Sequence, residues 1–419
     1  MESETLVYID LFEKTHLVGK LWTRTRNDKH TASFEYDRDW LLNPVHFSLE
    51  PALALGPGPF HSNDRALFGA IGDSAPDRWG RALMRRAERR RAKSEGKTPR
   101  TLREIDYLLL VDDETRQGAL RFAKTAGGPF LANDPTSKIP PLVDLPKLLT
   151  AAQHVLRDKE SDDDMRLLLA PGSSLGGARP KASVRDKDAH LAIAKFPHDG
   201  DEIDTSRWEA VALTLATKSG INVPPWRLEK IGNRDILLLR RFDRQNERRI
   251  PFVSAMSMLG AKDNEQKSYL DIVDALRQNG RNVEHDLQQL WRRVVLNILI
   301  SNTDDHLRNH GFLYGDTAGW QLSPAYDLNP VPIDIRPRIL STSIDLDDAT
   351  ASLDLALEVA AYFDLSAPEA RAIAYEVGMA VSSWSVVAAG LGIKSSEIER
   401  MSSAFEHEDL KKSIAGTHR

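Results

Sequence analysis

The sequence predicts an α+β protein whose first half is rich in strands and whose second half is mainly helical. Between residues 5 and 50, apolar and polar residues alternate in short runs such as Leu6–Ile9 and Ser33–Tyr36, a pattern typical of strands. From about residue 268, apolar residues recur at helical spacing, as at Leu287 and Val294. The length of 419 residues favours two or three domains or subdomains.

The composition is that of an ordinary globular protein, with 41% hydrophobic and 28% charged residues. A formal net charge of −5 restricts any contact with nucleic acid to a local surface. The absence of cysteine excludes disulfides, thiolate zinc sites and cysteine nucleophiles. The acidic start of the chain is unlike a signal peptide, and the uncharged stretch Val377–Ile393 is short for a membrane span, which favours a buried helix. The chain is therefore expected in the cytoplasm, without a membrane partner.

We expect three segments along the chain, namely residues 1–130, residues 131–245 and residues 246–419. In the first segment, a break at Gly56–Pro59 separates the predicted strands from a helix that includes Asp77 and Leu83. The basic run Arg85–Lys93 follows on this helix. Such a run is compatible with a solvated helix face or with a stripe that binds phosphates.

Apolar periodicity predicts further elements in the other two segments. They are a helix at Leu145–Leu156, strands at Ala182–Val184, His190–Phe196 and Ile236–Leu239, and a helix within Asp286–Ile300. Capping boxes at Ser206–Glu209 and Ser366–Glu369 predict the starts of two more helices, the first of which is expected to end at Gly220.

The segment Asn302–Asn309 carries the most informative polar residues of the chain. Phosphoryl transfer requires a carboxylate that orients the attacking hydroxyl, and an Asn and an Asp that hold magnesium against the phosphates. Asn309 follows Asp304 by five positions, which is the spacing of the protein-kinase signature. Asp327 then falls where the metal-binding Asp of the next hairpin is expected.

Two other interpretations fit the same segment. Its Asp and Asn side chains could merely cap neighbouring helices. Alternatively, the close spacing of carboxylates and histidines indicates a metal site built from Asp304, Asp305, His306 and His310. The metal site would account neither for Asp327 nor for the features that lie upstream.

A kinase also requires a lysine on a strand, where it neutralises the α- and β-phosphates. Lys195 lies in the strand-like run Leu191–Phe196, although an edge-strand lysine with its head in water has the same pattern. Glu209 lies on the next predicted helix. It is either the ion-pair partner of Lys195 or only a member of the predicted capping box.

The glycine-rich loop Gly172–Lys181 precedes the strand of Lys195. Glycine allows backbone N–H groups to approach a phosphate closely, which makes Gly176 and Gly177 candidate phosphate contacts. The kinase pattern G-x-G-x-x-G is absent, so a flexible surface loop is the alternative. Further on, a buried strand runs into Arg240 and Phe242, where the hinge of a kinase would present its backbone to adenine.

The order of these features decides between the interpretations. A glycine-rich loop, a strand lysine, a helix glutamate, a hinge strand, an Asp/Asn loop and a metal-binding Asp occur in the order of a protein kinase. Chance is a poor explanation for all of them together. The sequence therefore predicts a divergent protein-kinase-like fold of two lobes that uses ATP and Mg²⁺. A β-rich N-terminal subdomain is added to it, and its C-terminal lobe is mainly helical.

Over nearly its whole length, the chain resembles the HipA family, the serine/threonine kinase toxins of bacterial toxin–antitoxin pairs. The motifs that carry this resemblance are Pro76–Gly80, Ser174–Lys181, Ala194–Pro197, Arg241–Arg244, Asp304–Asn309 and Tyr326–Asp327. The match at Asp304–Asn309 is the most specific of them.

The resemblance implies roles for particular residues. Catalysis would involve Asp304, His306 and Asn309, and the metal would be held by Asn309 and Asp327. Contacts to ATP would come from Lys195, Gly176, Gly177, Arg240, Phe242, His306 and Asp327. Autophosphorylation is expected at Ser174, with Ser173 as the second candidate.

The resemblance also implies partners. They are a small helix-turn-helix antitoxin of the HipB type, operator DNA bound through the antitoxin complex, and a translation component such as an aminoacyl-tRNA synthetase as substrate. Two other functions stay open. One is a metal-dependent phosphohydrolase that uses Asp304 and His306, and the other is a non-catalytic, DNA-associated scaffold that uses Arg85–Lys93.

Overall fold

The computed structural model describes residues 2–26, 29–63, 65–133, 139–169, 177–246, 248–315 and 319–415. The chain forms two compact units. Unit 1 consists of Met1–Gly200 and Glu229–Val253, and unit 2 consists of Asp201–Leu228 and Ser254–Arg419. The division into three segments with boundaries near residues 130 and 245 stays a prediction.

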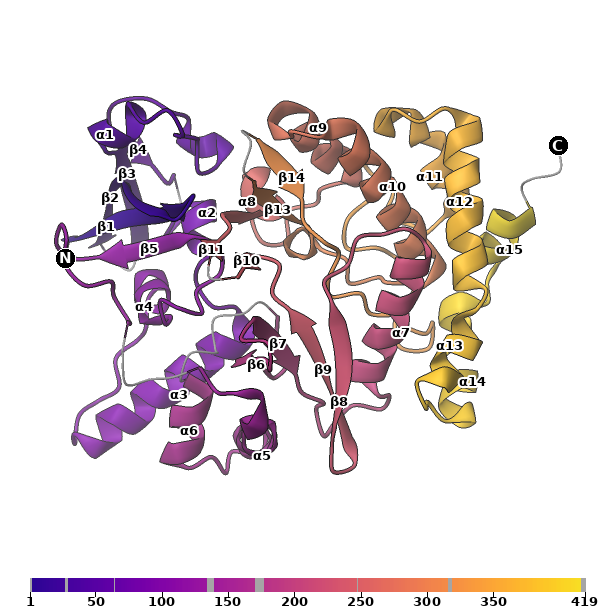
Figure 1. The fold of residues 1–419 in the computed structure, drawn as a ribbon, viewed down its shortest axis with the longest axis horizontal. Helices are drawn as coiled ribbons and strands as arrows, with labels where there is room; N and C mark the ends of the chain where they lie inside the picture. The colour runs from indigo at the N-terminus through magenta and orange to yellow at the C-terminus, as the bar shows by residue number, and fades with distance from the viewer. Residues whose placement is uncertain are drawn as a thin grey trace. The chain divides into compact units, whose positions relative to one another are not determined.

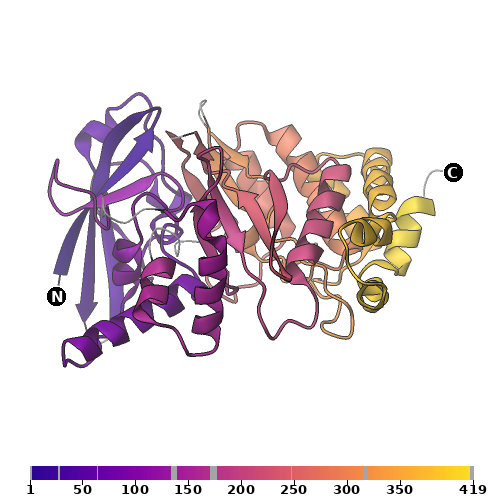
Figure 2. The same cartoon turned by 60° about the horizontal axis from the view of Figure 1, so that its bottom comes forward.

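Unit 1 begins with a five-stranded antiparallel sheet in the order β4-β3-β2-β1-β5 (Figures 1 and 2). Its strands are β1 (Glu2–Leu11), β2 (Lys14–Arg26), β3 (Lys29–Tyr36), β4 (Phe60–His61) and β5 (Leu120–Ala123). Cross-strand partners point to the same face of a sheet. Thr5, Leu21 and Phe34 are such partners and are buried, so this face covers the core of the sheet. The strands predicted between residues 5 and 50 are confirmed as far as Tyr36.

Among the residues described, unit 1 contains eight helices, and the two longest of them are α3 and α5. They are α1 (Arg38–Leu41), η1 (Pro51–Leu53), α2 (Gly69–Gly72), α3 (Arg78–Ser94), α4 (Glu104–Leu110), η2 (Leu142–Asp144), α5 (Leu145–Leu156) and α6 (Asp162–Leu169). The long helix α3 begins at a cap, because the Asp77 side chain accepts a hydrogen bond from the N–H of Arg78. Its apolar residues Trp79 and Leu83 join a core with Leu148 of α5 and Leu168 of α6.

A second sheet of unit 1 has the order β6-β7-β9-β8. Its strands are β6 (Lys181–Arg185), β7 (Leu191–Lys195), β8 (Trp226–Ile231) and β9 (Arg234–Arg240), and three short strands follow, β10 (Arg244–Gln245), β11 (Arg248–Arg249) and β12 (Phe252–Ser254). The predicted strands at 182–184, 190–196 and 236–239 correspond to β6, β7 and β9. Lys195 pairs with Lys181 on one side and with Leu237 on the other, which places it on an inner strand.

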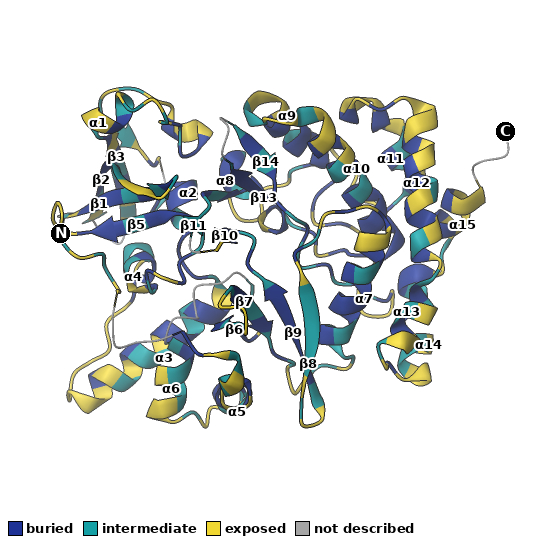
Figure 3. Ribbon diagram, viewed as in Figure 1, coloured by how far each residue is buried: buried dark blue, intermediate teal, exposed yellow. Residues whose placement is uncertain are grey.

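Unit 2 is mainly helical. Its elements are α7 (Thr205–Lys218), α8 (Ala255–Met258), α9 (Tyr269–Asn279), α10 (Val283–Leu299), η3 (Leu307–Asn309), β13 (Gly311–Tyr314), β14 (Trp320–Leu322), α11 (Leu353–Glu358), η4 (Ala360–Phe363), α12 (Ala367–Val381), α13 (Trp384–Gly390), α14 (Ser395–Phe405) and α15 (Glu408–Ala415). The central helix is α10, which is buried over most of its length (Figure 3). Strands β13 and β14 form an antiparallel hairpin after it.

The capping box predicted at Ser206–Glu209 is wrong. The N-cap of α7 is Asp204, whose carboxylate accepts a hydrogen bond of 3.1 Å from the N–H of Arg207. Ser206 and Glu209 are therefore helical residues, and both are buried. Aspartate and serine are equally good N-cap residues. The sequence pattern alone therefore could not distinguish Asp204 from Ser206 as the start of the helix. The box predicted at Ser366–Glu369 is confirmed at the start of α12.

The uncharged stretch near the end of the chain is not one buried helix. It comprises the last turns of α12, a turn at Ser382 and Ser383, and α13. By length and composition alone, Ala367–Gly390 is apolar enough to cross a membrane, with a mean hydropathy of 1.3 in its most apolar window. Half of that window is buried in unit 2, where α12 packs on α7, α10 and α15, as expected of a core helix.

Candidate phosphoryl-transfer site

The loop that carries Asp304 begins directly after α10 in unit 2. Asp304 is exposed, whereas its neighbours Thr303 and Asp305 are buried. The carboxylate of Asp304 forms an ion pair of 2.9 Å with Arg336, and both side chains face solvent. The carboxylate of Asp304 is therefore exposed to solvent, while the residues on either side of it are anchored in the interior of unit 2.

The support below this loop is a buried polar network around Asp305. The Asp305 carboxylate accepts hydrogen bonds from the Tyr269 hydroxyl at 2.6 Å and from the Asn297 amide at 2.8 Å, and it contacts His310 Nε2 at 2.7 Å. Burial alone would raise the pKa of Asp305, but the charge of His310 and the hydrogen bonds of His310 and Tyr269 lower this pKa overall. Asp305 is thus an anchor that holds a negative charge inside unit 2. Sequence reasoning considered Asp305 only as a possible metal ligand and missed this role, because the role depends on residues from α9 and α10.

Asn309 ends the loop in the short helix η3 and is buried. Its amide nitrogen donates a hydrogen bond of 3.2 Å to the carbonyl of Asp304. This bond orients the side-chain oxygen of Asn309 away from that contact and leaves it as a hard donor for a cation. His306 is half-buried, and its Nδ1 is buried without a hydrogen-bond partner among the residues described. A phosphate oxygen is a group that would satisfy this nitrogen.

Asp327 does not belong to a strand, contrary to the expectation of a hairpin carboxylate. Strand β14 ends at Leu322, and Asp327 lies in irregular backbone with φ of 59°, in the left-handed region. Asn302 joins this segment to the loop of Asp304. Its side-chain oxygen accepts a hydrogen bond of 3.1 Å from the N–H of Asn329, and its amide donates to Asn297 of α10 at 3.0 Å. Asp327 is therefore tied to the same scaffold as Asp304.

The metal site proposed from Asp304, Asp305, His306 and His310 does not form. Among the described residues, no group of three or more His, Asp or Glu side chains is placed to hold a metal ion. Asp305 and His310 face each other inside the buried network instead. Asn309 and Asp327 fit magnesium better, because Mg²⁺ prefers oxygen ligands, takes only one or two carboxylates and completes its shell with water and phosphate.

The predicted nucleotide contacts of unit 1 lie around β7. Lys195 is at the end of this strand, as predicted, and is half-buried. Lys181, its partner on β6, is buried with 6% of its surface exposed. The Lys181 side chain approaches Gly177, which has a left-handed backbone. Two lysines thus lie side by side at the end of the glycine-rich loop, and a Cβ at Gly177 would contact one of them.

Gly177 is the only one of the predicted loop contacts that falls within the described residues, since Ser173, Ser174 and Gly176 lie outside them. Its N–H donates to the Asp77 carboxylate, and its carbonyl accepts a hydrogen bond of 3.3 Å from the N–H of Trp79. The indole N–H of Trp79 donates to the carbonyl of Lys181 at 3.0 Å. The motif at 76–80 therefore holds the end of the glycine-rich loop against β6.

The predicted hinge segment after β9 is mostly a buried polar lock. Arg241 and Arg244 form ion pairs with Asp243, the latter at 2.9 Å, and all three side chains are buried. Asp243 also accepts a hydrogen bond of 2.8 Å from the N–H of Gly118, and both arginines donate to the carbonyl of Arg116. The motif 241–244 thus fastens the end of β9 to the loop that precedes β5.

The two residues of this segment predicted to contact ATP have other contacts. Arg240 contacts the ring of His190, with 2.6 Å from its Nη2 to Nε2. The ring of Phe242 packs against Phe252, with 6.2 Å between centroids. Their contact with adenine stays a prediction.

The candidate residues are divided between the units. Lys195 and Gly177 belong to unit 1, whereas Asp304, Asn309, Asp327 and Glu209 belong to unit 2. Glu209 is buried within α7, which excludes the capping role, and its pairing with Lys195 stays a prediction.

The basic run on α3 is largely neutralised within unit 1. Arg86 and Arg90 form ion pairs with Asp158, Glu160 and Asp162, and Arg91 pairs with Glu88 and Glu95. Arg85, Arg89 and Lys93 are exposed and form no ion pair with the residues described. These three lie four residues apart and therefore share one helix face. The prediction that the basic run forms a solvated helix face is confirmed for Arg85, Arg89 and Lys93. These three side chains are the cations of the run that a partner could still contact.

Comparison with known families defines the class of this chain. Residues 173–384 match the HipA-like C-terminal domain, and residues 9–105 match the HipA N-terminal domain. The first match alone covers half of the sequence, and the chain belongs to the HipA family.

Two curated relatives are similar over part of their length. The chain is 24% identical over 195 residues to a protein of Haemophilus influenzae named "Putative kinase", covering 41% of this chain and 56% of that protein. It is 26% identical over 181 residues to "Putative kinase Y4mE" of Sinorhizobium fredii, covering 37% of this chain and 41% of that protein. The chain thus spans about half the length of the curated relatives it matches.

One solved structure is similar over nearly the whole chain. It is the complex of HipA, HipB and operator DNA from the toxin–antitoxin system of Shewanella oneidensis MR-1. The match has a TM-score of 0.66 and 16% identity, and it covers 98% of this chain and 96% of that one. This likeness is one of fold. The predicted α+β class, with an N-terminal sheet ahead of a kinase-like part, is confirmed.

Proposed function

We propose that this chain is an ATP- and magnesium-dependent serine/threonine protein kinase that serves as the toxin of a HipA/HipB-type pair. The observation that carries the proposal is the scaffold of the Asp304 loop. Asp304 is exposed, Asn309 is fixed by its bond to the Asp304 carbonyl, and Asp327 is tied to the loop through Asn302. Family membership and the names of the relatives support the same function.

Each residue has a part in this proposal. Asp304 orients the acceptor hydroxyl and receives its proton, and its exposure leaves room for a protein substrate. Asn309 and Asp327 hold the metal ion, while Lys195 neutralises the phosphates of ATP. The metal ion, when bound, neutralises charge on the transferred phosphoryl group. His306 donates a hydrogen bond from Nδ1 to a phosphate oxygen.

Incubation with ATP and Mg²⁺ followed by intact-mass measurement tests the reaction. Wild type is expected to gain phosphate, whereas Asp304→Asn is expected to lose transfer by about a hundredfold or more, because general-base catalysis contributes about that much. Asp354→Asn is the matched control, since this exposed carboxylate on α11 pairs with Lys412, away from the Asp304 loop. Near-normal transfer by Asp304→Asn would contradict the assignment, and phosphate release without transfer would favour a phosphohydrolase.

The partners proposed for this chain are a HipB-type antitoxin and, through it, operator DNA. The fold likeness to the Shewanella complex supports this proposal. A helix-turn-helix protein encoded beside this chain is expected to co-purify with it, and the complex is expected to bind DNA more tightly than the chain alone. We also propose a cytoplasmic location and a translation component, such as an aminoacyl-tRNA synthetase, as substrate. Phosphorylated proteins identified by mass spectrometry after induction of the wild type and of Asp304→Asn would test the substrate.

Autophosphorylation at Ser174, with Ser173 as the second acceptor, is proposed as a self-limiting switch. The contacts of Asp77 and Trp79 with Gly177 support it, because they show where the C-terminal end of the loop is held. A phosphate on Ser174 would compete with ATP for Lys181 and Lys195. Phosphopeptide mapping decides the site, and nucleotide affinity is then compared with a Ser173→Ala/Ser174→Ala variant. Unchanged affinity after phosphorylation would rule out the switch.

A further inference from the structure

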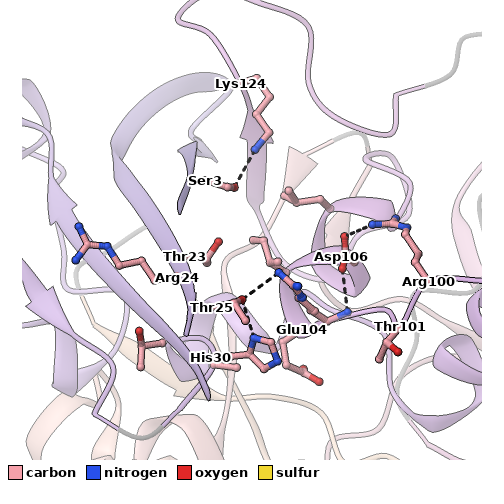
Figure 4. Close-up of a pocket in the computed structure, with 15 residues that line it drawn as sticks. Ser3, Thr23, Arg24, Thr25, His30, Arg100, Thr101, Glu104, Asp106 and Lys124 are labelled. Atoms are coloured by element: carbon pink, nitrogen blue, oxygen red, sulfur yellow. Dashed lines mark hydrogen bonds and ion pairs between the residues drawn. The ribbon is translucent and has the colours of Figure 1, made fainter. Parts of the chain in front are cut away.

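Unit 1 contains a cavity of about 480 Å³ between the five-stranded sheet and α4 (Figure 4). The sheet contributes Ser3, Thr23, Thr25 and His30 to its wall, and Arg103 lies at the start of α4. None of these residues is used in the proposed phosphoryl transfer. The cavity is also within the size range of small-molecule sites, which is roughly 300 to 1,000 Å³.

The strand register explains why this wall is polar. Ser3 pairs with Thr23, and Thr25 pairs with His30, so all four side chains lie on the face that also carries Leu21. Further along this face, Leu21 and Phe34 are buried in the core. Toward α4, this face carries hydroxyls and a histidine in place of large apolar residues. A core position would not require this change, but a binding site for a polar ligand would.

Two of the positive charges at the cavity, those of Arg103 and Lys124, donate to neutral groups. Arg103 donates a hydrogen bond of 3.1 Å to the Thr25 hydroxyl, which also contacts His30 Nδ1 at 3.0 Å. Lys124 donates at 3.0 Å to both the Glu4 carbonyl and the Thr5 hydroxyl. These acceptors are all neutral, and no ion pair joins Arg103 or Lys124 to a carboxylate in the part of the chain that is described. Partial burial lowers the pKa of Lys124, as expected of a cation without a counter-charge.

The two carboxylates at the cavity are already neutralised by other arginines. Glu104 forms an ion pair with Arg81 at 2.5 Å, and Asp106 forms one with Arg100 at 2.8 Å. Arg24 also lines the cavity, but its guanidinium points away from the other labelled side chains (Figure 4). The positive charge that faces the cavity without an ion pair therefore comes from Arg103 and Lys124, each of which donates to a hydroxyl group.

We propose that this cavity binds a phosphorylated organic molecule of about the size of a nucleoside monophosphate. Arg103 and Lys124 would hold its phosphate, since guanidinium and ammonium groups are the usual donors to phosphate oxygens, and the Thr25 and Ser3 hydroxyls would add hydrogen bonds. Ile105 and Leu109 of α4 line the same cavity and provide an apolar wall for the organic part. Such a ligand would bind to residues of the N-terminal part of the chain, none of which is a proposed contact of ATP.

Calorimetric titration of the 419-residue chain with ribose 5-phosphate tests this site. Ribose is the uncharged control, and inorganic phosphate is the control without an organic part. Ribose 5-phosphate is expected to bind more tightly than either. Arg103→Ala and Lys124→Met are each expected to weaken it about tenfold or more, because a hydrogen bond to a charged group contributes about 1.5–3 kcal/mol.

Two further variants separate this site from others. Lys20→Met removes a charge from the opposite face of β2, where Lys20 pairs with Leu6, and is expected to bind normally. Lys195→Met is expected to bind normally as well, because the proposed kinase site is not involved. Absence of binding by wild type, equal binding of inorganic phosphate, or a loss in Lys195→Met that exceeds the loss in Arg103→Ala would each overturn the proposal. Thermal unfolding of every variant verifies that it is folded.

Discussion

The polar residues of the Asp304 loop differ mainly in what lies behind them. Asp304 and Asp305 are neighbours with the same side chain, yet one faces solvent and the other accepts hydrogen bonds from Tyr269 and Asn297. A carboxylate at the surface is accessible to a substrate even when it forms an ion pair, as Asp304 does with Arg336, whereas a buried carboxylate must be compensated by hydrogen bonds or charge. The difference supports the chemical role proposed for Asp304 and gives Asp305 a structural one.

The left-handed backbone of Asp327 leads to a prediction. At φ of 59°, Asn is tolerated almost as well as Asp, whereas a β-branched residue is strained by roughly 1–2 kcal/mol. Asp327→Asn is therefore expected to keep the thermal stability of wild type but to lose most magnesium-dependent nucleotide binding. Asp327→Val is expected to lose both. Nucleotide titrations with and without Mg²⁺, beside thermal unfolding, measure the two effects. Full magnesium-dependent binding by Asp327→Asn would remove this residue from the metal site.

At the scale of elements, the motif 241–244 shows how a segment near a proposed site also stabilises the fold. Asp243 is buried between Arg241 and Arg244. Burial opposes its ionisation, but the two guanidinium groups hold its pKa well below the usual range. The stability that follows is present above the ordinary pKa of an aspartate, near 3.8, and is lost as the pH falls below it.

Removal of Asp243 is expected to destabilise unit 1 strongly. Asp243→Ala leaves two buried guanidinium groups without a counter-charge, which costs about 3–5 kcal/mol in comparable buried pairs. Arg240→Ala, close by in sequence and only partly buried, is the matched control and is expected to cost far less. Urea unfolding at neutral pH measures the free energies. Equal losses for the two variants would show that the buried ion pairs do not stabilise the fold.

Helix α3 allows a test within a single element. In the proposed antitoxin complex, neutralisation of Arg85, Arg89 and Lys93 is expected to make the salt dependence of DNA binding shallower, by about 1 in log–log slope for each phosphate that the helix no longer binds. The matched control neutralises Arg86, Arg90 and Arg91, which already pair with carboxylates. It is expected to leave the slope almost unchanged. If the slope is the same after the first triple substitution, α3 has only a solvated face.

At the scale of the whole molecule, two titratable groups, one buried and one half-buried, make the units respond oppositely to pH. In unit 1, burial raises the pKa of Glu50 to about 7. In unit 2, burial and the charge of Arg338 lower the pKa of His407 to about 4, against a smaller opposing effect of Asp409. In folded unit 1, Glu50 therefore keeps a proton that it releases above pH 4.5 in the unfolded chain. In folded unit 2, His407 stays neutral at pH values below 6.5 at which it binds a proton in the unfolded chain.

The expected outcome is that acidification from about pH 7 to about pH 4 destabilises unit 2 through His407 and stabilises unit 1 through Glu50. Between pH 6.5 and 4, unit 2 is expected to lose about 3 kcal/mol through His407, at about 1.4 kcal/mol for each unit of pKa difference. Over the rise from pH 4.5 to 7, unit 1 is expected to lose a similar amount through Glu50. Amide hydrogen exchange across this range resolves the two units. His407→Gln and Glu50→Gln should each flatten the response of one unit only, and a parallel change in both units would contradict this account.

The sequence by itself determined the order of the elements and the residue types of the candidate site. Strands β1–β3, β6, β7 and β9 and the helices α5 and α10 follow from periodicity of apolar residues, which depends only on near neighbours. The spacing of Asp304 and Asn309 was likewise visible, because both residues belong to one short loop. Such local patterns depend on residues that are close in sequence, so they can be recognised without knowledge of the tertiary contacts.

Only the tertiary structure decided which polar residues face solvent and which are anchors. The capping of α7 by Asp204, the tether from Asn302 to Asn329 and the bond from Gly177 to Asp77 join or select residues that local patterns rank equally. The lock of Asp243 to Gly118 spans 125 positions of sequence. Such contacts form because buried polar groups must find partners, and the available partner is set by packing rather than by sequence distance.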